Sequence, residues 1–220
     1  MPGRIIAIGD IHGCLTALSA LLAGIDPQPH DTLVTLGDYI DRGPDSRGVI
    51  ERLLVAKQQC CLVPLLGNHD QMLLLICDGM RELMSDWRLF GGDATLASYG
   101  GRGSEAVPSD HLDFLRNCRL FYETDHHFFV HASYQENLPL AEQEREVLLW
   151  YSIKRLLPGP HFSGKTAIVG HSAQKSGEVL DVGHLKCLDT YCYGGGWLTA
   201  LDVESNQVWQ VNNEGRPRGL

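Results

Sequence analysis

Short apolar runs recur along the first third of the chain, and each is followed by residues with helical spacing. Ile5 to Ile8 form a continuous apolar run, which predicts a buried strand. The leucines at positions 15, 18, 21 and 22 then recur on one face of a helix. The predicted order is strand, glycine-containing loop, helix.

The same order occurs twice more. Residues 32–36 predict a second strand before a helix over about 49–54, and residues 61–66 predict a third before a helix over 72–76. Three such units in series predict parallel strands with right-handed crossovers. Ligands of such sheets bind beyond the carboxyl ends of the strands, so the three loops after the apolar runs are where we expect a site.

The second half of the chain has a different pattern. Residues 78–117 are helical in character and rich in glycine, and the pattern assigns them no role. From Leu120 onward, short apolar runs separated by glycine or polar turns predict a mixed or antiparallel sheet. The expected strands cover residues 128–131, 166–169, 178–182, 185–189, 198–203 and 207–211.

The length of 220 residues suits one domain with a core of its own, and we expect a single α/β domain over residues 1–220. Pro158-Gly159-Pro160 predicts a loop rather than a domain boundary, because the strands on either side are too few to close a core alone.

The net charge of −9 disfavours binding to duplex nucleic acid or to an anionic membrane, because both need clustered lysine and arginine. The apolar run near the N-terminus is too short for a signal peptide or a membrane span, so we expect a cytoplasmic protein. The pattern does not predict an oligomeric state.

The loops after the three apolar runs contain side chains that bind metals. They read Gly-Asp-Ile-His-Gly at residues 9–13, Gly-Asp-Tyr-Ile-Asp-Arg-Gly at 37–43 and Gly-Asn-His-Asp at 67–70. Carboxylate, imidazole and amide oxygen are ligands of divalent ions. Asp10 and His12 leave the same face of an extended segment and can hold one ion, while Asp38 has two oxygens that can bridge two ions.

Two later histidines follow β-like runs in the same way. His131 comes after residues 128–130 and His171 after residues 168–170, so each would reach the carboxyl end of a strand. A two-metal site activates water and neutralises charge on phosphoryl oxygens. The sequence therefore predicts a two-metal enzyme that hydrolyses phosphate esters.

The remaining chemistry needs a proton donor and an anion-binding group. His69 is the candidate general acid for the leaving oxygen, and Asp41 is the candidate carboxylate that orients its imidazole. Arg42 can clamp phosphate oxygens through its planar guanidinium.

These motifs resemble the phosphoprotein phosphatase family of calcineurin-like metallophosphoesterases, in particular the phage lambda type of protein phosphatase and the symmetrical diadenosine tetraphosphatases. The resemblance is strong over residues 5–75 and then rests on separate residues. It implies two mixed β-sheets between helices (α/β/β/α). It also implies two divalent ions, with manganese expected and iron, zinc, cobalt, nickel and magnesium as alternatives.

The resemblance also implies a role for each side chain. The implied ligands of the first ion are Asp10, His12 and Asp38, and those of the second are Asp38, Asn68, His131 and His171. His69 matches the position of the acid, paired with the position of Asp41. Arg42 and Asn68 match the phosphate-binding positions.

The chain departs from the family pattern in three places. Trp150-Tyr151-Ser152 stands where lambda-type members have Trp-Asn-Arg, so a second phosphate-binding arginine is missing unless Lys154 or Arg155 takes its place. Ser172 replaces the usual threonine after the last histidine. After Asp189 and Thr190, family members often continue with glycine, whereas this chain has Tyr191 and Tyr193, whose rings could line the mouth of the site.

The expected activity is hydrolysis of phosphomonoesters by metal-bound hydroxide, as in a serine/threonine protein phosphatase of broad specificity. The alternative is a symmetrical dinucleoside polyphosphate hydrolase, or a nucleotide phosphatase or phosphodiesterase, which the missing arginine favours. The substrate would be a phosphorylated protein, a small phosphate ester or a nucleotide. An inactive metal-binding regulator is disfavoured, because all the expected ligands and His69 are present.

Overall fold

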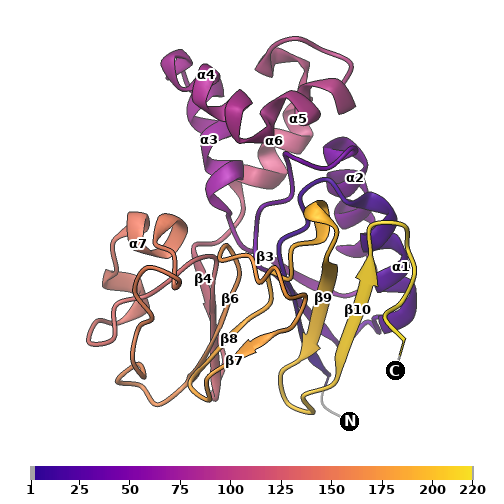
Figure 1. Cartoon of the computed structure of the whole chain (residues 1–220). Helices are drawn as coiled ribbons and strands as arrows, with labels where there is room; N and C mark the ends of the chain where they lie inside the picture. The colour runs from indigo at the N-terminus through magenta and orange to yellow at the C-terminus, as the bar shows by residue number, and fades with distance from the viewer. Residues whose placement is uncertain (1–2, 220) are drawn as a thin grey trace.

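The computed structural model describes residues 3–219 and contains two five-stranded sheets (Figure 1). The first has the order β10-β9-β1-β2-β3, in which β1, β2 and β3 are parallel while β9 is antiparallel to both β1 and β10. Its strands are β1 (Ile5–Ile8), β2 (Thr32–Thr35), β3 (Cys61–Pro64), β9 (Trp197–Asp202) and β10 (Val208–Asn212).

The second sheet has the order β4-β5-β6-β8-β7, with three parallel strands in the middle and an antiparallel strand at each edge. Its strands are β4 (Phe121–Glu123), β5 (His127–Val130), β6 (Thr166–Val169), β7 (Leu180–Asp181) and β8 (Leu185–Cys187). Both sheets are therefore mixed, as the family resemblance implies.

The helices lie on the outer faces of the two sheets. They are α1 (Leu15–Ile25), α2 (Ser46–Ala56), α3 (Asn68–Cys77), α4 (Met84–Trp87), α5 (Asp93–Ser98), α6 (Ser109–Arg116) and α7 (Arg145–Trp150). Shorter helical turns cover Arg81–Leu83, Arg88–Gly92, Ser104–Ala106, Leu140–Glu142 and Cys192–Gly194. Figure 1 shows α3 to α6 grouped together and α7 apart from them. Within residues 3–219, none of these helices has the length and apolar content to cross a membrane.

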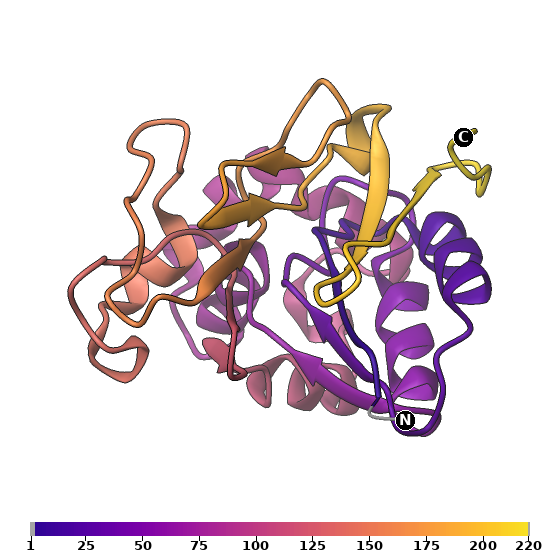
Figure 2. The same cartoon turned by 90° about the horizontal axis from the view of Figure 1, so that it is seen from below.

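Three buried clusters lie between these layers. Alternate residues of a strand point to opposite faces, so Ile6 packs against the helices while Ala7 faces the second sheet. In β5, Phe129 faces the first sheet and Phe128 packs in the cluster that includes Leu148 of α7. Figure 2, seen from below, separates α1 and α2 from the strands of the second sheet. The α/β/β/α prediction is confirmed.

The structure corrects three details of the expected elements. The third helix begins at Asn68, so the third motif forms its first turn instead of a loop before it. Residues 121–123 form an additional strand, β4. The last two strands, β9 and β10, join the first sheet through β1. The pattern of one strand does not identify its pairing partner, because pairing is decided by tertiary contacts.

Candidate metal centre

The predicted site residues meet at the carboxyl ends of five parallel strands from the two sheets. Asp10 and His12 follow β1, the second motif follows β2, and Asn68 opens α3 after β3. His131 follows β5 and His171 follows β6. Strands from both sheets therefore contribute to one site, with each motif at the carboxyl end of a strand as predicted.

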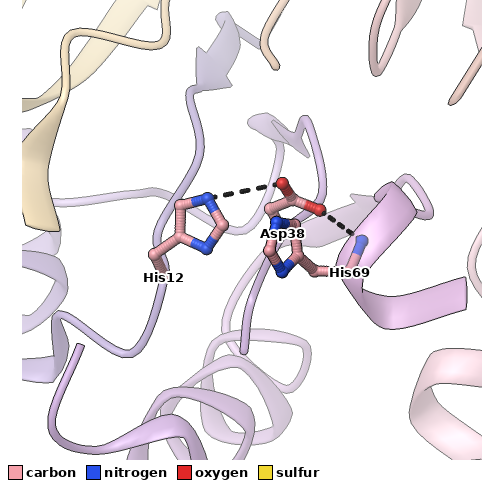
Figure 3. Close-up of side chains that lie close together, drawn as sticks. All are labelled: His12, Asp38 and His69. Atoms are coloured by element: carbon pink, nitrogen blue, oxygen red, sulfur yellow. Dashed lines mark hydrogen bonds and ion pairs between the residues drawn. The ribbon is translucent and has the colours of Figure 1, made fainter. Parts of the chain in front are cut away.

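The first group of possible metal ligands is His12, Asp38 and His69, whose ligand atoms lie within 4.8 Å of one another (Figure 3). His12 Nε2 lies 3.4 Å from Asp38 Oδ2. The Nδ1 of His12 lies 2.9 Å from the carbonyl oxygen of Ile40, so this nitrogen holds the proton and donates it. The lone pair on Nε2 is left for a cation.

The second group is Asp38, His131 and His171. His131 donates through Nδ1 to the carbonyl oxygen of Leu36 at 2.7 Å, and its Nε2 lies 3.6 Å from Asp38 Oδ1. Asn68 Oδ1 lies 2.9 Å from His131 Nε2 and 3.0 Å from His171 Nδ1. The two oxygens of Asp38 therefore face different groups, which is the arrangement of a bridging carboxylate.

The donor set fits two divalent cations. Lone pairs on His131 Nε2 and Asn68 Oδ1 converge at about the distance expected of neighbouring ligands on one ion, which is roughly 3 Å when each lies about 2.1 Å from the metal. Imidazole nitrogen with carboxylate and amide oxygen suits manganese, iron, zinc and related ions. Burial lowers the pKa of His12 and His131, and that of His171 to about 4, so the rings are neutral and can act as ligands.

Asp10 lies beside these groups without joining either of them. Both of its carboxylate oxygens accept a hydrogen bond from the backbone N–H of His171, each at 3.0 Å. The converging atoms around His12 and Asp38 include His69 instead of Asp10. The role of Asp10 as a metal ligand therefore stays a prediction.

The pair of His69 and Asp41 has the geometry expected of an oriented proton donor. His69 Nδ1 donates to Asp41 Oδ2 at 2.7 Å, and Asp41 is fully buried. Trp87 donates its indole N–H to the same oxygen at 2.8 Å, and Thr95 donates its hydroxyl to the other oxygen at 2.6 Å. Trp87 and Thr95 come from residues 78–117, so that segment has the role that the sequence did not reveal.

Asp70 also supports the site, and its role was not predicted from the sequence. Its Oδ2 accepts from the backbone N–H groups of Asp38 and Gly67, and its Oδ1 accepts from that of Tyr39. This buried carboxylate therefore ties the second motif to the third. Its position inside the quoted Gly-Asn-His-Asp motif was the available signal. A Cβ on Gly67 would lie 2.1 Å from Asp38 Oδ1, so only glycine allows this close approach.

Arg42 spans the first group of ligands. Its two terminal nitrogens donate to His12 Nε2 and His69 Nε2, each at 2.8 Å. Its guanidinium carbon lies 4.5 Å from the centre of the Tyr193 ring, and that ring meets the edge of His12 at 4.9 Å. Tyr193 therefore forms part of the wall of the site.

Several site residues have left-handed backbone conformations. The φ angles are 44° at His12, 51° at Asp38, 71° at Asp41, 69° at Arg42 and 60° at His171. Such conformations cost a side chain-bearing residue on the order of 1 kcal/mol or more and persist only where surrounding contacts hold them. The hydrogen bonds to Asp41 and Asp70 supply contacts of that kind.

Two of the departures from the family pattern contact each other. The hydroxyl of Ser152 lies 3.0 Å from that of Ser172, which also accepts the backbone N–H of Ile153. Lys154 donates its ammonium group to the carbonyl oxygen of Ala173, two residues past His171. Of the two candidate replacements for the arginine, Lys154 thus binds the backbone two residues past His171, while Arg155 lines a cavity together with Ser152.

Two cavities lie near the ligand groups. A cavity of about 950 Å³ lies next to Ser152 and is lined in part by Ser133, Tyr134, Tyr151 and Arg155. A smaller one of about 200 Å³ is lined in part by Arg42 and Tyr193. The first includes Ser133, two residues past His131, and the second adjoins Arg42.

Comparison with known proteins identifies a family and several relatives. The sequence model of the calcineurin-like phosphoesterases matches residues 3–197. A symmetrical bis(5'-nucleosyl)-tetraphosphatase of Janthinobacterium is 35% identical over 70% of this chain, which spans 51% of that protein's length. The chain likewise spans about half the length of its Bordetella relatives of the same name. Serine/threonine-protein phosphatase 1 of Salmonella typhimurium is 29% identical over 90% of both chains.

Solved structures share the fold over the whole chain. The crystal structure of a candidate diadenosine tetraphosphatase has a TM-score of 0.72 and 25% identity, and the match covers 100% of this chain and 95% of that one. A cold-active protein tyrosine phosphatase of Shewanella has a TM-score of 0.71 at 18% identity, with 99% and 80% covered, and shows the fold alone.

Proposed function

Because the chain belongs to the calcineurin-like phosphoesterase family, we propose that it hydrolyses dinucleoside polyphosphates, with diadenosine tetraphosphate as the substrate to test first. Membership makes it a metallophosphoesterase, a hydrolase of phosphoric esters. The relatives named as symmetrical tetraphosphatases support the finer proposal better than they support a protein phosphatase. The alternative raised from the sequence thus becomes the leading hypothesis.

The observation that carries the proposal is Ser152, which stands in place of a phosphate-binding arginine and is paired with the hydroxyl of Ser172. Two cavities near the site offer room for a larger substrate. A dinucleotide has a nucleoside at each end of its phosphate chain, so it needs space on both sides of the reacting phosphorus. The cavity of about 950 Å³ has the size of a ligand site and exposes the ring of Tyr151, and the smaller one adjoins Tyr193. A phosphoserine side chain would need only one of them.

The residues of the chain have distinct roles in the proposed reaction. Two divalent cations, once bound by Asp10, His12, Asp38, Asn68, His131 and His171, would activate water for attack on phosphorus and neutralise phosphoryl charge. We expect manganese, which the donor set accepts. Arg42 would turn its donors from the two imidazoles to the phosphate oxygens, together with Asn68. Once Arg42 turns away, His69, held by Asp41, would take up a proton at Nε2 and give it to the leaving oxygen.

A serine/threonine protein phosphatase is the second candidate. The Salmonella phosphatase matches this chain over 90% of both proteins. Lys154, whose ammonium group binds the carbonyl oxygen of Ala173 two residues past His171, would then partly replace the missing arginine in binding a phosphorylated side chain.

Product analysis separates the two candidates. The purified protein, supplied with Mn²⁺, is given diadenosine tetraphosphate or a phosphothreonine peptide, and an Asp38→Asn variant controls for contaminating enzymes. Symmetrical cleavage of the dinucleotide gives ADP alone and supports the proposal. Release of phosphate from the peptide without cleavage of the dinucleotide supports the second candidate. A metal-loaded protein that cleaves neither would overturn both.

A further inference from the structure

Asp189 is a buried carboxylate with one unpaired oxygen. It follows β8, and its side chain is 2% exposed. Its Oδ1 accepts the backbone N–H of Tyr191 at 3.1 Å and so closes a tight turn. Its Oδ2 is fully covered and has no hydrogen-bond partner within residues 3–219.

An oxygen of this kind is unusual because it is costly. Burying an ionised carboxylate without a partner costs several kcal/mol, so nearly all such groups in folded proteins are paired with a cation or a donor. The turn at Tyr191 needs only Oδ1, and a neutral asparagine would serve it equally well. The second oxygen therefore has no structural role that explains it.

The backbone places Asp189 beside the residue that opens the first motif. A Cβ on Gly9 would lie 2.3 Å from the carbonyl oxygen of Leu188 and 3.3 Å from the nitrogen of Asp189, so the two segments are in direct contact. Asp10, the residue after Gly9, is also a buried carboxylate, and both of its oxygens accept the backbone N–H of His171. Two buried carboxylates, Asp10 and Asp189, thus lie on adjoining segments beside the ligand groups that Asp38 joins.

We propose that Asp189 is a further carboxylate of the metal centre, whose free Oδ2 serves the divalent cation on the side of Asp10 and His12. This inference rests on the proposed function, since it requires that the protein bind metal ions. A cation there would neutralise the carboxylates of Asp10 and Asp189 and give Oδ2 the partner that it lacks.

The test measures metal binding and does not depend on turnover. Mn²⁺ is titrated calorimetrically into the metal-free protein and into Asp189→Asn, which keeps an acceptor for the Tyr191 N–H but loses the charge. We expect two Mn²⁺ ions in the parent protein. In the variant, one of them should bind about 10–100-fold more weakly.

Asp202 offers a matched control. It is also buried, and its Oδ1 accepts the backbone N–H of the residue two positions on, Glu204, at 3.1 Å. Its Oδ2 accepts the hydroxyl of Ser205. In the sheet, Asp202 lies opposite Ile6, toward the end of β1 that is away from the site. Asp202→Asn should bind both ions as the parent does.

Thermal unfolding of the metal-free proteins distinguishes a metal-centre role from a purely structural one. Asp189→Asn removes an unpaired buried charge, so its metal-free melting temperature should equal or exceed that of the parent. Asp202→Asn should melt lower, because both of its oxygens are paired. A drop for Asp189→Asn with unchanged Mn²⁺ affinity would overturn the inference.

Two further outcomes are informative. If Asp189→Asn does not fold, Asp189→Ser replaces it, because serine keeps a hydroxyl acceptor for the turn. Its Mn²⁺ binding is measured in the same way, and unchanged binding of both ions would refute a role of Asp189 in the metal centre. A parent protein that binds no Mn²⁺ would refute the dinuclear centre itself, which is a separate failure.

Discussion

His69 shows at the scale of one residue how the environment defines a chemical role. Its Nδ1 proton is held by a buried carboxylate, so Nε2, which accepts from Arg42 in this structure, is the nitrogen left to act toward the substrate once Arg42 turns to the phosphate. How much the reaction needs this nitrogen depends on the leaving group. An alkoxide is a poor leaving group and needs a proton, whereas ADP leaves as a stable anion.

We therefore expect His69→Asn to lower kcat for an alkyl phosphate ester by about 10²–10⁴-fold, the usual contribution of a positioned acid. The loss with diadenosine tetraphosphate should be smaller. Steady-state kinetics on both substrates, with Mn²⁺ content measured in parallel, checks this. Full activity of the variant on the alkyl ester would rule out the acid role.

Ser152 is a single residue at which we expect substrate preference to depend on the missing arginine. Its hydroxyl is paired with that of Ser172, and no arginine reaches the second ligand group from this turn. Ser152→Arg would add a charged donor at the position where lambda-type members have one. A charge-assisted hydrogen bond contributes about 1.5–3 kcal/mol, so kcat/KM for a phosphomonoester should rise about tenfold or more. Ser163→Arg, at an exposed position away from the site, is the control, and an equal rise there would contradict the prediction.

At the scale of elements, residues 78–117 support the proposed general acid. The Trp87 side chain is fully buried at the end of α4, and its indole nitrogen donates to Asp41. The pair of Asp41, on the loop after β2, and His69, in the first turn of α3, is thus held from a third, separate element.

Removing this contact should weaken both stability and catalysis. Trp87→Phe keeps most of the apolar volume but leaves the buried Asp41 with one donor fewer, which costs about 1–3 kcal/mol. We expect a lower melting temperature and a fall in kcat of about tenfold for an alkyl ester. Trp209→Phe on β10 changes a tryptophan away from the site and should leave kcat unchanged; a similar fall there would show that the effect is not local.

Asp31, just before β2, accepts hydrogen bonds from Arg4, just before β1, so its carboxylate links the starts of the two strands. Burial raises the pKa of Asp31, but hydrogen bonds from Arg4 and from the backbone of Gln28 outweigh it and lower the pKa to about 2. The folded value lies below the usual 3.8, so this carboxylate stabilises the protein above about pH 4 and the contribution disappears as pH falls toward 2.

Urea unfolding between pH 6 and pH 2 measures that contribution. The parent should lose about 1–2 kcal/mol more than Asp31→Asn over this range, a value kept low because Arg4 is one-third exposed and solvent screens the pair. Parallel pH curves for the two proteins would contradict the assignment.

The sequence predicts single strands and the loops that follow them, but not the contacts between distant elements. The boundaries of β1 and β6 follow from continuous apolar runs, and their loops place Asp10, His12 and His171 correctly at strand ends. The partners of Asp41 are 46 and 54 residues away in the sequence, and no local pattern joins them. Only tertiary packing reveals such contacts.

At the scale of the whole molecule, the metal centre joins the two sheets. Asp38 comes from the first sheet and faces His131 and His171 of the second. Cations at this junction would link the sheets and neutralise buried carboxylates.

We accordingly expect removal of metal to destabilise the entire fold. Saturation at about 100 times Kd stabilises by roughly 2.7 kcal/mol for one site, which for a domain of this size corresponds to about 5–10 °C. Calorimetry before and after chelation, followed by readdition of Mn²⁺, checks this. Asp38→Asn should show a much smaller shift, and an equal shift in that variant would mean that the ions act elsewhere.

The order of strands in the first sheet has a consequence for synthesis on the ribosome. β1 is synthesised well before its neighbour β9, which begins only at Trp197. At about 5–20 residues per second, one edge of β1 waits roughly 10–40 s for its partner. During that interval the nascent chain exposes an apolar strand edge that can pair with other chains, so ribosome-associated chaperones would be needed until β9 has been synthesised.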